Sequence, residues 1–96
     1  MILDLKKYKI DNIPLEKKEV KFLLLLSDNE LHTRDECMDY LKIYSNATFF
    51  KRVSTINNKI CKNFIINKYG IGYKVKNKIK INYWKGQVIW NNTMLY

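Results

Sequence analysis

The apolar positions of this chain follow two spacings, and the change between them comes at Phe64. From residue 15 to 64 they recur mainly every three or four residues, which is the period of an amphipathic helix. After Phe64 they alternate with polar residues, which is the period of a strand. Helical segments followed by strands predict an α+β domain.

The N-terminal part of the chain predicts strands and then a helix. Alternating apolar residues in segment 1–13 end at the turn-prone pair Asp11-Asn12 and predict one or two short strands. Pro14 then opens a helix that we expect to run roughly from Leu15 to Leu26. The apolar residues of this helix occupy more than one of its faces, so we expect it to pack against several neighbouring elements.

A second helix is predicted from its start signal, the sequence Thr33-Arg34-Asp35-Glu36. This is a capping box, in which the Thr33 hydroxyl accepts from the Glu36 amide and the Glu36 side chain returns to the Thr33 amide. The apolar pattern breaks at segment 44–46, and Asn46 is a good N-cap for a third helix.

The third helix is the strongest prediction of the helical region. Apolar residues recur from Phe49 to Phe64 at spacings of 4, 3, 4 and 4, which describes one face of a helix of about four turns. The opposite face has no acid, although a solvated helix face normally mixes charges. It is either a plain solvated face or a face that lies against DNA. Its residues are Lys51, Arg52, Thr55, Asn58, Lys59 and Lys62.

The segment after residue 72 predicts a strand with one basic face. Lysines occupy the even positions 74, 76, 78 and 80, while apolar residues occupy most of the odd ones. On a continuous strand these lysines would form a ladder about 20 Å long, unless Asn77 makes a turn. Segment 84–87 then predicts a tight turn into Val88–Trp90 and a terminal hairpin.

Charge is distributed very unevenly between the two parts of the chain. Residues 1–39 hold all nine acids and seven Lys or Arg, for a net charge of −2. Residues 40–96 hold eleven Lys or Arg and no acid, for a net charge of +11. Such a polycation binds polyanions, so the candidate partners are nucleic acid and an anionic membrane surface.

Several functional classes are disfavoured by the sequence. The longest apolar run, Phe22–Leu26, is far shorter than the roughly 20 residues of a membrane helix, and the N-terminus lacks the apolar core of a signal peptide, so we expect a cytoplasmic protein. Cys37, Cys61 and the single histidine form no metal-binding or disulfide pattern. We expect both cysteines to be buried, His32 to lie on the surface, and the protein to hold no metal or cofactor.

The local sequences resemble the OmpR/PhoB-type winged helix-turn-helix domain. The apolar positions of Val53–Ile60 match those at the end of that family's recognition helix, and segment 65–73, IINKYGIGY, is similar to the sequence of its wing. The resemblance covers residues 13–75. It implies three helices, a C-terminal β-hairpin wing and short N-terminal strands.

The resemblance also assigns roles within the hairpin. Gly70 and Gly72 would allow the tight turn of the wing, and Tyr73 would pack its ring beneath it. A dinucleotide-binding loop would need a third glycine and a following helix. In addition to the third-helix residues above, the expected DNA contacts of the wing are Asn67, Lys68, Tyr69, Lys74, Lys76 and Lys78.

Two features depart from the family pattern. Tyr69 stands where the family usually carries a wing arginine, and Thr55 and Asn57 replace bases of the recognition helix. We therefore expect the lysines of the wing to contribute more of the affinity than usual.

We expect residues 1–96 to form one stand-alone domain, with a core at 13–75 and an extension at 76–96. The extension is rich in aromatic residues, which form either a homodimer contact or a cover over the domain's own open face. They are Tyr83, Trp84, Trp90 and Tyr96.

The sequence leads to the hypothesis of a non-enzymatic, sequence-specific binder of double-stranded DNA. Such a protein acts either as a small plasmid or mobile-element transcription regulator or as an accessory protein at a conjugative transfer origin. The chain is similar to small clostridial plasmid proteins, including relaxosome accessory proteins of conjugation. The alternative hypothesis is binding of single-stranded nucleic acid or RNA through the basic, aromatic hairpin.

Overall fold

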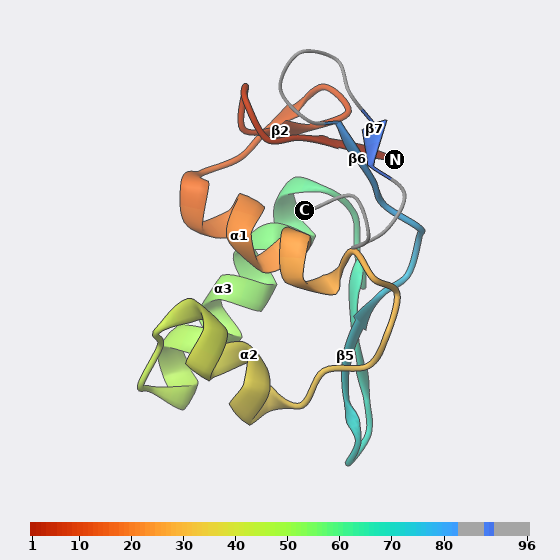
Figure 1. The fold of residues 1–96 in the computed structure, drawn as a ribbon. Coiled ribbons are helices and arrows are strands. Elements are labelled where there is room, and N and C mark those ends of the chain that lie inside the picture. The colour runs from red at the N-terminus through yellow and green to blue at the C-terminus, as the bar shows by residue number, and fades with distance from the viewer. Residues whose placement is uncertain (83–87, 90–96) are drawn as a thin grey trace.

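Helix α1 crosses the middle of the molecule, with a small sheet on one side and helices α2 and α3 on the other (Figure 1). A two-stranded hairpin runs along the edge of this arrangement. The computed structural model describes residues 1–82 and 88–89. Its elements are β1 (Ile2–Asp4), β2 (Lys9–Ile10), β3 (Ile13–Pro14), α1 (Lys17–Leu26), α2 (Arg34–Leu41), α3 (Asn46–Lys59), β4 (Ile65–Lys68), β5 (Gly72–Val75), β6 (Lys80–Asn82) and β7 (Val88–Ile89).

The larger sheet joins the two ends of the described chain. Its strand order is β3-β2-β1-β6-β7, and β1 runs parallel to β6 with Leu3 opposite Ile81. The predicted α+β arrangement of N-terminal strands, three helices and a hairpin is confirmed. Three N-terminal strands form rather than one or two. Segment 80–82 is part of their sheet, because β6 pairs with β1, and Ile81 is buried in the shared core.

The predicted helices exist, and α2 starts after Thr33 as expected, but the starts of α1 and α3 differ from the expectation. Pro14 lies in β3 rather than at the start of α1, which begins at Lys17. The N-cap of α3 is Ser45, one residue before the predicted Asn46, and its Oγ accepts from the Thr48 amide at 3.4 Å.

Half of the predicted capping box at α2 is confirmed. The Thr33 hydroxyl accepts from the Glu36 amide at 3.1 Å. The expected return contact from Glu36 to the Thr33 amide is wrong, because the Glu36 carboxylate instead meets the ring of His32 at 2.7 Å.

Helix α3 is shorter than its apolar pattern suggested. It ends at Lys59, and the chain then makes a turn in which Asn63 has a φ of +61°. Phe64 is fully buried, but it reaches the core from this turn and not from the helix. The four-residue spacing of buried positions thus continues past the end of the helix. For this reason the spacing alone did not show where the backbone changes direction.

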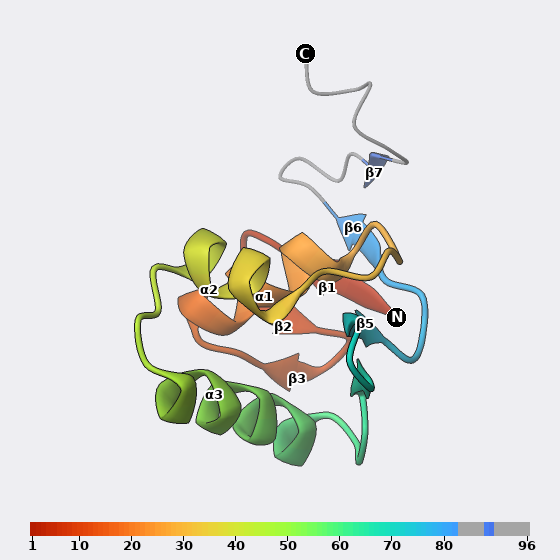
Figure 2. The same cartoon turned by 90° about the horizontal axis from the view of Figure 1, so that it is seen from below.

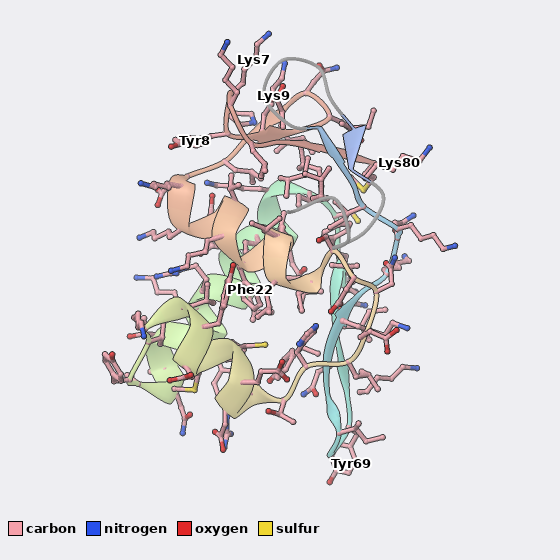
Figure 3. The ribbon with its side chains drawn as sticks, in the orientation of Figure 1. Lys7, Tyr8, Lys9, Phe22, Tyr69 and Lys80 are labelled. Atoms are coloured by element: carbon pink, nitrogen blue, oxygen red, sulfur yellow. The ribbon has the colours of Figure 1, made fainter. Side chains whose placement is uncertain are left out.

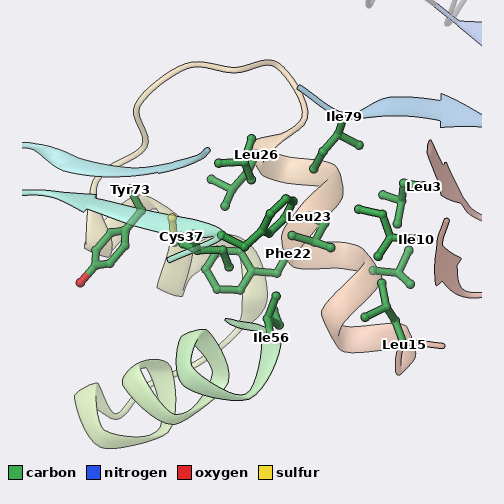
Figure 4. Close-up of a cluster of buried hydrophobic side chains, with 14 of the residues drawn as sticks. Leu3, Ile10, Leu15, Phe22, Leu23, Leu26, Cys37, Ile56, Tyr73 and Ile79 are labelled. Carbon is green, nitrogen blue, oxygen red and sulfur yellow. The ribbon is translucent and has the colours of Figure 1, made fainter. Parts of the chain in front are cut away.

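The hydrophobic core extends from the sheet through α1 to α3 and the hairpin (Figure 4). Leu3 and Ile10 line its sheet end, and Phe22 of α1 lies at its centre. The ring of Phe49 on α3 lies 5.7 Å from that of Phe22 and 5.1 Å from that of Tyr73 on β5, the latter in an edge-to-face arrangement. Tyr73 thus packs beneath the hairpin, as the sequence suggested.

The continuous ladder of lysines does not form. Strand β5 ends at Val75, a bend follows at Lys76 and Asn77, and β6 belongs to the other sheet. The alternative of a turn near Asn77 is therefore correct. The bend allows the buried Ile79 to join the core, while Lys76 and Lys78 stay exposed.

Other sequence predictions concern the C-terminal segment and membranes. Strands β6 and β7 pair antiparallel, with Ile81 opposite Ile89. The predicted turn at 84–87 and the aromatic residues Tyr83, Trp84, Trp90 and Tyr96 lie outside the described residues. Across residues 1–82 and 88–89, no helix has the length and apolar character needed to cross a membrane.

The two glycines of the hairpin have different roles. Gly70 has a φ of +72° in the turn, and a Cβ added there would meet no atom within 4 Å, so this glycine provides the left-handed backbone. Gly72 lies in β5, where a Cβ would come within 2.6 Å of the His32 carbonyl oxygen. The expectation that Gly72 serves the turn is wrong; it permits close packing of the hairpin against the α1–α2 loop.

We predict that Gly72→Ala lowers the free energy of unfolding by about 1–3 kcal/mol, because the added methyl group must displace backbone atoms. Gly70→Asn is the matched control, since asparagine tolerates left-handed backbone and the site is open, and should cost less than about 1 kcal/mol. Urea unfolding followed by circular dichroism measures both. Equal losses in the two variants would contradict the different roles assigned to these glycines.

Candidate functional site

An open groove separates the outer side of α3 from the β4–β5 hairpin. Figure 2 shows α3 lying across one side of the molecule with the hairpin rising beside its C-terminal end. Both walls and the connecting turn contribute side chains to the groove. The lining residues are Phe50, Val53, Ser54, Asn57, Asn58, Cys61, Lys62, Asn63, Ile65, Ile66, Asn67, Tyr73 and Lys76.

Asn57 fixes the angle between the two walls of this groove. Its Oδ1 accepts from the Ile65 amide at 2.8 Å, and its Nδ2 donates to the Ile65 carbonyl at 3.5 Å. One side chain of α3 therefore satisfies both backbone groups of the buried first residue of β4. The hairpin is held to the helix directly and does not hang from the turn alone.

A second attachment joins the hairpin to the segment before α2. The Tyr73 amide donates to the His32 carbonyl at 2.8 Å, and the His32 amide donates to the Tyr73 carbonyl at 3.0 Å. This short antiparallel bridge lies beside Gly72, whose missing side chain allows the backbones to approach. Asn57 attaches β4 to α3, and this bridge attaches β5 to the segment before α2, so each strand of the hairpin has its own attachment.

His32 is buried, contrary to the expectation of a surface residue. Only 7% of it is exposed. Its Nδ1 lies 2.7 Å from Glu36 Oε2, and its Nε2 lies 3.0 Å from both carboxylate oxygens of Asp28. Burial opposes the charged ring, but the hydrogen bonds from Asp28 and Glu36 outweigh it, and the pKa of His32 is raised above 6.5. The two carboxylates bind opposite nitrogens of the imidazole ring, so the ring lies between them and their oxygens do not face a shared ligand position.

The predicted third-helix residues divide between two flanks of α3. Asn58 and Lys62, just beyond the helix, line the groove beside the hairpin. Lys51, Arg52, Thr55 and Lys59 are not among the lining residues. At 100° per residue Arg52 and Lys59 fall farthest around the helix from Phe50 and Ser54, whereas Lys51 lies only about 20° from Asn58.

Lys59 also has a partner within the protein. Its Nζ lies 2.7 Å from Glu19 Oε1, and the same oxygen accepts from the Glu16 amide at 2.8 Å. The Glu19 side chain is only 2% exposed. This ion pair joins the start of α1 to the end of α3. Lys59 therefore has less charge to offer an external anion than its exposed neighbours.

The predicted hairpin residues lie along its length and tip. Asn67 and Lys76 line the groove, and Lys68 is exposed near the turn. Tyr69 is 97% exposed at the end of the hairpin, the farthest point from the larger sheet (Figure 3). Lys74 is half-buried opposite Ile66, and Lys78 is exposed beyond the bend.

Several groove residues were not predicted from the sequence. Phe50 and Ser54 precede Asn58 at intervals of four residues, and this i, i+4, i+8 line was the signal that could have identified them. Arg34 lies in a smaller hollow shared with the hairpin turn residues Gly70 and Ile71. Its place at the start of α2 gave no such signal.

The cysteines divide between the core and the surface. Cys37 is fully buried, and burial followed by the nearby Glu36 charge raises the pKa of its thiol to about 12, so it is chemically inert. Cys61 is exposed at the groove, which corrects the expectation that both are buried.

The charge of the groove is uniform in sign. None of its lining residues is acidic, and Lys62 and Lys76 stand on its two sides. A separate group of lysines, including Lys7, Lys9 and Lys80, lies at the opposite end of the molecule from Tyr69 (Figure 3).

Comparison of the chain with protein-family models, with curated proteins and with solved structures finds no match.

We predict that Asn57→Ala lowers the free energy of unfolding by about 1–2 kcal/mol, because it leaves the buried Ile65 amide without its acceptor. The adjacent Asn58→Ala should change stability by less than about 0.5 kcal/mol, since within the described residues the Asn58 side chain makes no hydrogen bond. Chemical unfolding of both variants measures the difference. Similar stabilities would show that Asn57 does not hold the hairpin.

We predict that His32 stabilises the fold most at low pH. A raised folded-state pKa means that its contribution is fully present below the unfolded value of about 6.5 and is lost as the pH rises through the folded-state pKa. The difference in unfolding free energy between wild type and His32→Gln should therefore shrink as the pH increases from about 6 to 8.5. A difference that is constant or grows over this range would contradict the ion pairs of His32.

Proposed function

We propose that this chain is a winged helix-turn-helix protein that binds double-stranded DNA sequence-specifically and has no enzymatic activity. Helix α3 serves as the recognition helix, and the β4–β5 hairpin serves as the wing. The observation that supports this most directly is the acid-free groove between these two elements, whose walls are held in fixed relation by Asn57 and Tyr73.

The dimensions of α3 suit the major groove of DNA. Its 14 residues make a rod about 21 Å long, and a B-DNA major groove is wide enough to admit one α-helix. The outer side of α3 carries no acid and has exposed side chains along its whole length. The adjacent wing projects Tyr69, which could lie against sugars at the edge of a neighbouring groove.

Charged side chains on either side of the groove support contacts to two phosphate backbones. On the helix side, Lys51 and Lys62 are exposed, with Lys62 at the groove and Lys51 outside it, and Arg52 and Thr55 are half-buried outside the groove. On the wing side, Lys68, Lys76 and Lys78 are exposed. Such contacts position the protein on DNA, and side chains in the groove read base edges.

The cellular role stays open between two forms of the same activity. A transcription regulator would protect a promoter from cleavage, and an accessory protein of conjugation would protect a transfer origin. Both act on DNA in the cytoplasm. Footprinting across the replicon that encodes the protein would distinguish them.

A second candidate is the binding of single-stranded nucleic acid or RNA. The 97% exposure of Tyr69 favours it, because an exposed ring beside Lys68 could stack on an unpaired base. It explains the wing but leaves the acid-free side of α3 unused. We therefore favour duplex DNA.

We predict that duplex DNA binds better than single strands of the same sequence, with affinity that falls steeply as salt increases. Roughly 4 to 7 phosphate contacts per monomer give a slope of log K against log salt of about −4 to −6. Fluorescence anisotropy with labelled duplex and unlabelled competitors measures both quantities. Preferred binding of single strands, or affinity independent of salt, would contradict the proposal.

Two matched double variants show in the same assay which element provides more of the affinity. Lys68→Ala with Lys76→Ala removes two exposed charges from the wing, and Lys51→Ala with Lys62→Ala removes two from the helix side. We expect the wing variant to lose at least as much affinity. Lys59 is left unchanged because it pairs with Glu19, so the comparison does not disturb the fold.

A further inference from the structure

One line of side chains on α3 is uncharged and faces the hairpin. Phe50, Ser54 and Asn58 follow each other at intervals of four residues, and all three are exposed and line the groove. The neighbouring line, with Lys51 and Thr55, does not line the groove, and Lys51 lies about 20° from Asn58 around the helix. The uncharged line is therefore bordered on its outer side by a basic side chain.

The structure fixes two members of this line in defined environments. The ring of Phe50 packs edge-on against the buried Phe49 with centroids 5.7 Å apart, yet 47% of Phe50 is exposed. Asn58 points outward beside Asn57, whose amide is occupied by the Ile65 backbone. Asn58 is thus the amide of this pair that can bind a ligand.

These side-chain types match one kind of base pair. An asparagine amide can donate to N7 and accept from the N6 amino group of adenine, and an aromatic ring can contact the C5-methyl group of thymine. The usual reader of guanine is an arginine or lysine that donates to O6 and N7. None of these three residues is either, and Lys62, at the next interval of four, lies beyond the end of α3. Ser54 can accompany either base.

We propose that the groove reads A·T base pairs, with Asn58 contacting adenine, Phe50 contacting a thymine methyl group, and Ser54 between them. This inference rests on the proposed duplex binding and adds the bases that are preferred. The basic side chains that flank the line argue for a nucleic acid as its occupant. Lys62 and Lys76 at the rim would bind phosphates, and the uncharged line would enter the major groove between them.

The test uses the wild-type protein and a duplex selected from a random pool. We expect A·T pairs at the centre of the selected site. Thymines there are then replaced singly by deoxyuridine, which lacks only the methyl group. At one or two positions this should weaken binding about three- to tenfold, as expected for an apolar contact of one methyl group. Replacing a contacted adenine by 7-deazaadenine should weaken it about fivefold or more.

Variants assign these effects to residues. Phe50→Ala should bind thymine and deoxyuridine duplexes equally, whereas Phe50→Leu should keep part of the preference. Asn58→Ala should lose the sensitivity to 7-deazaadenine. Lys62→Ala is the control, and it should weaken all duplexes by a common factor and keep both preferences.

The outcomes separate this inference from the proposed function. Duplex binding that is insensitive to both analogues, or a G·C-rich selected site, would overturn A·T reading and leave DNA binding in place. Absence of duplex binding would overturn both. Because the analogues are tested with the wild-type protein, the answer does not depend on the stability of any variant.

Discussion

The arrangement of the candidate site depends on how Tyr73 holds the hairpin. Its backbone forms a two-hydrogen-bond bridge with His32, and its ring lies edge-on to Phe49. Gly72 makes this approach possible, because any side chain there would meet the His32 carbonyl. A single residue of β5 therefore contacts both the segment just before α2 and the first turn of α3, and the groove between helix and hairpin follows from that constraint.

Charge is distributed on this framework in two ways. Acids of the N-terminal half stabilise the protein internally: Glu19 pairs with Lys59, and Asp28 and Glu36 hold His32. Bases of the C-terminal half mostly remain at the surface, as Lys62, Lys68 and others do. The net charge of +11 in residues 40–96 is thus concentrated on α3, the hairpin and the segment that follows. This separation is what makes a polyanionic partner physically favourable.

Periodicity and cap signals predicted the three helices and the burial of Phe49, because these depend on local spacing. The hairpin and the packing of Tyr73 beneath it were implied by the family resemblance. Periodicity placed Phe64 on α3 since a core position keeps its spacing even where the backbone turns. It could not reveal that Gly72 packs against His32 or that Lys59 pairs with Glu19, because these contacts join segments about 40 residues apart. The site was predicted only in part for the same reason: the sequence marked the charged residues, whereas the groove lined by Phe50 and Ser54 exists only once the hairpin is in place.

In the proposed function, α3 and the hairpin form one DNA-binding surface. The most direct measurement is a titration of ¹⁵N-labelled protein with a short duplex, followed through backbone amide chemical shifts. We expect the largest changes along the outer side of α3 from Phe50 to Lys62 and in the hairpin around Lys68 and Tyr69. Changes concentrated instead around Lys7 and Lys9, at the far end of the molecule, would contradict the proposed surface.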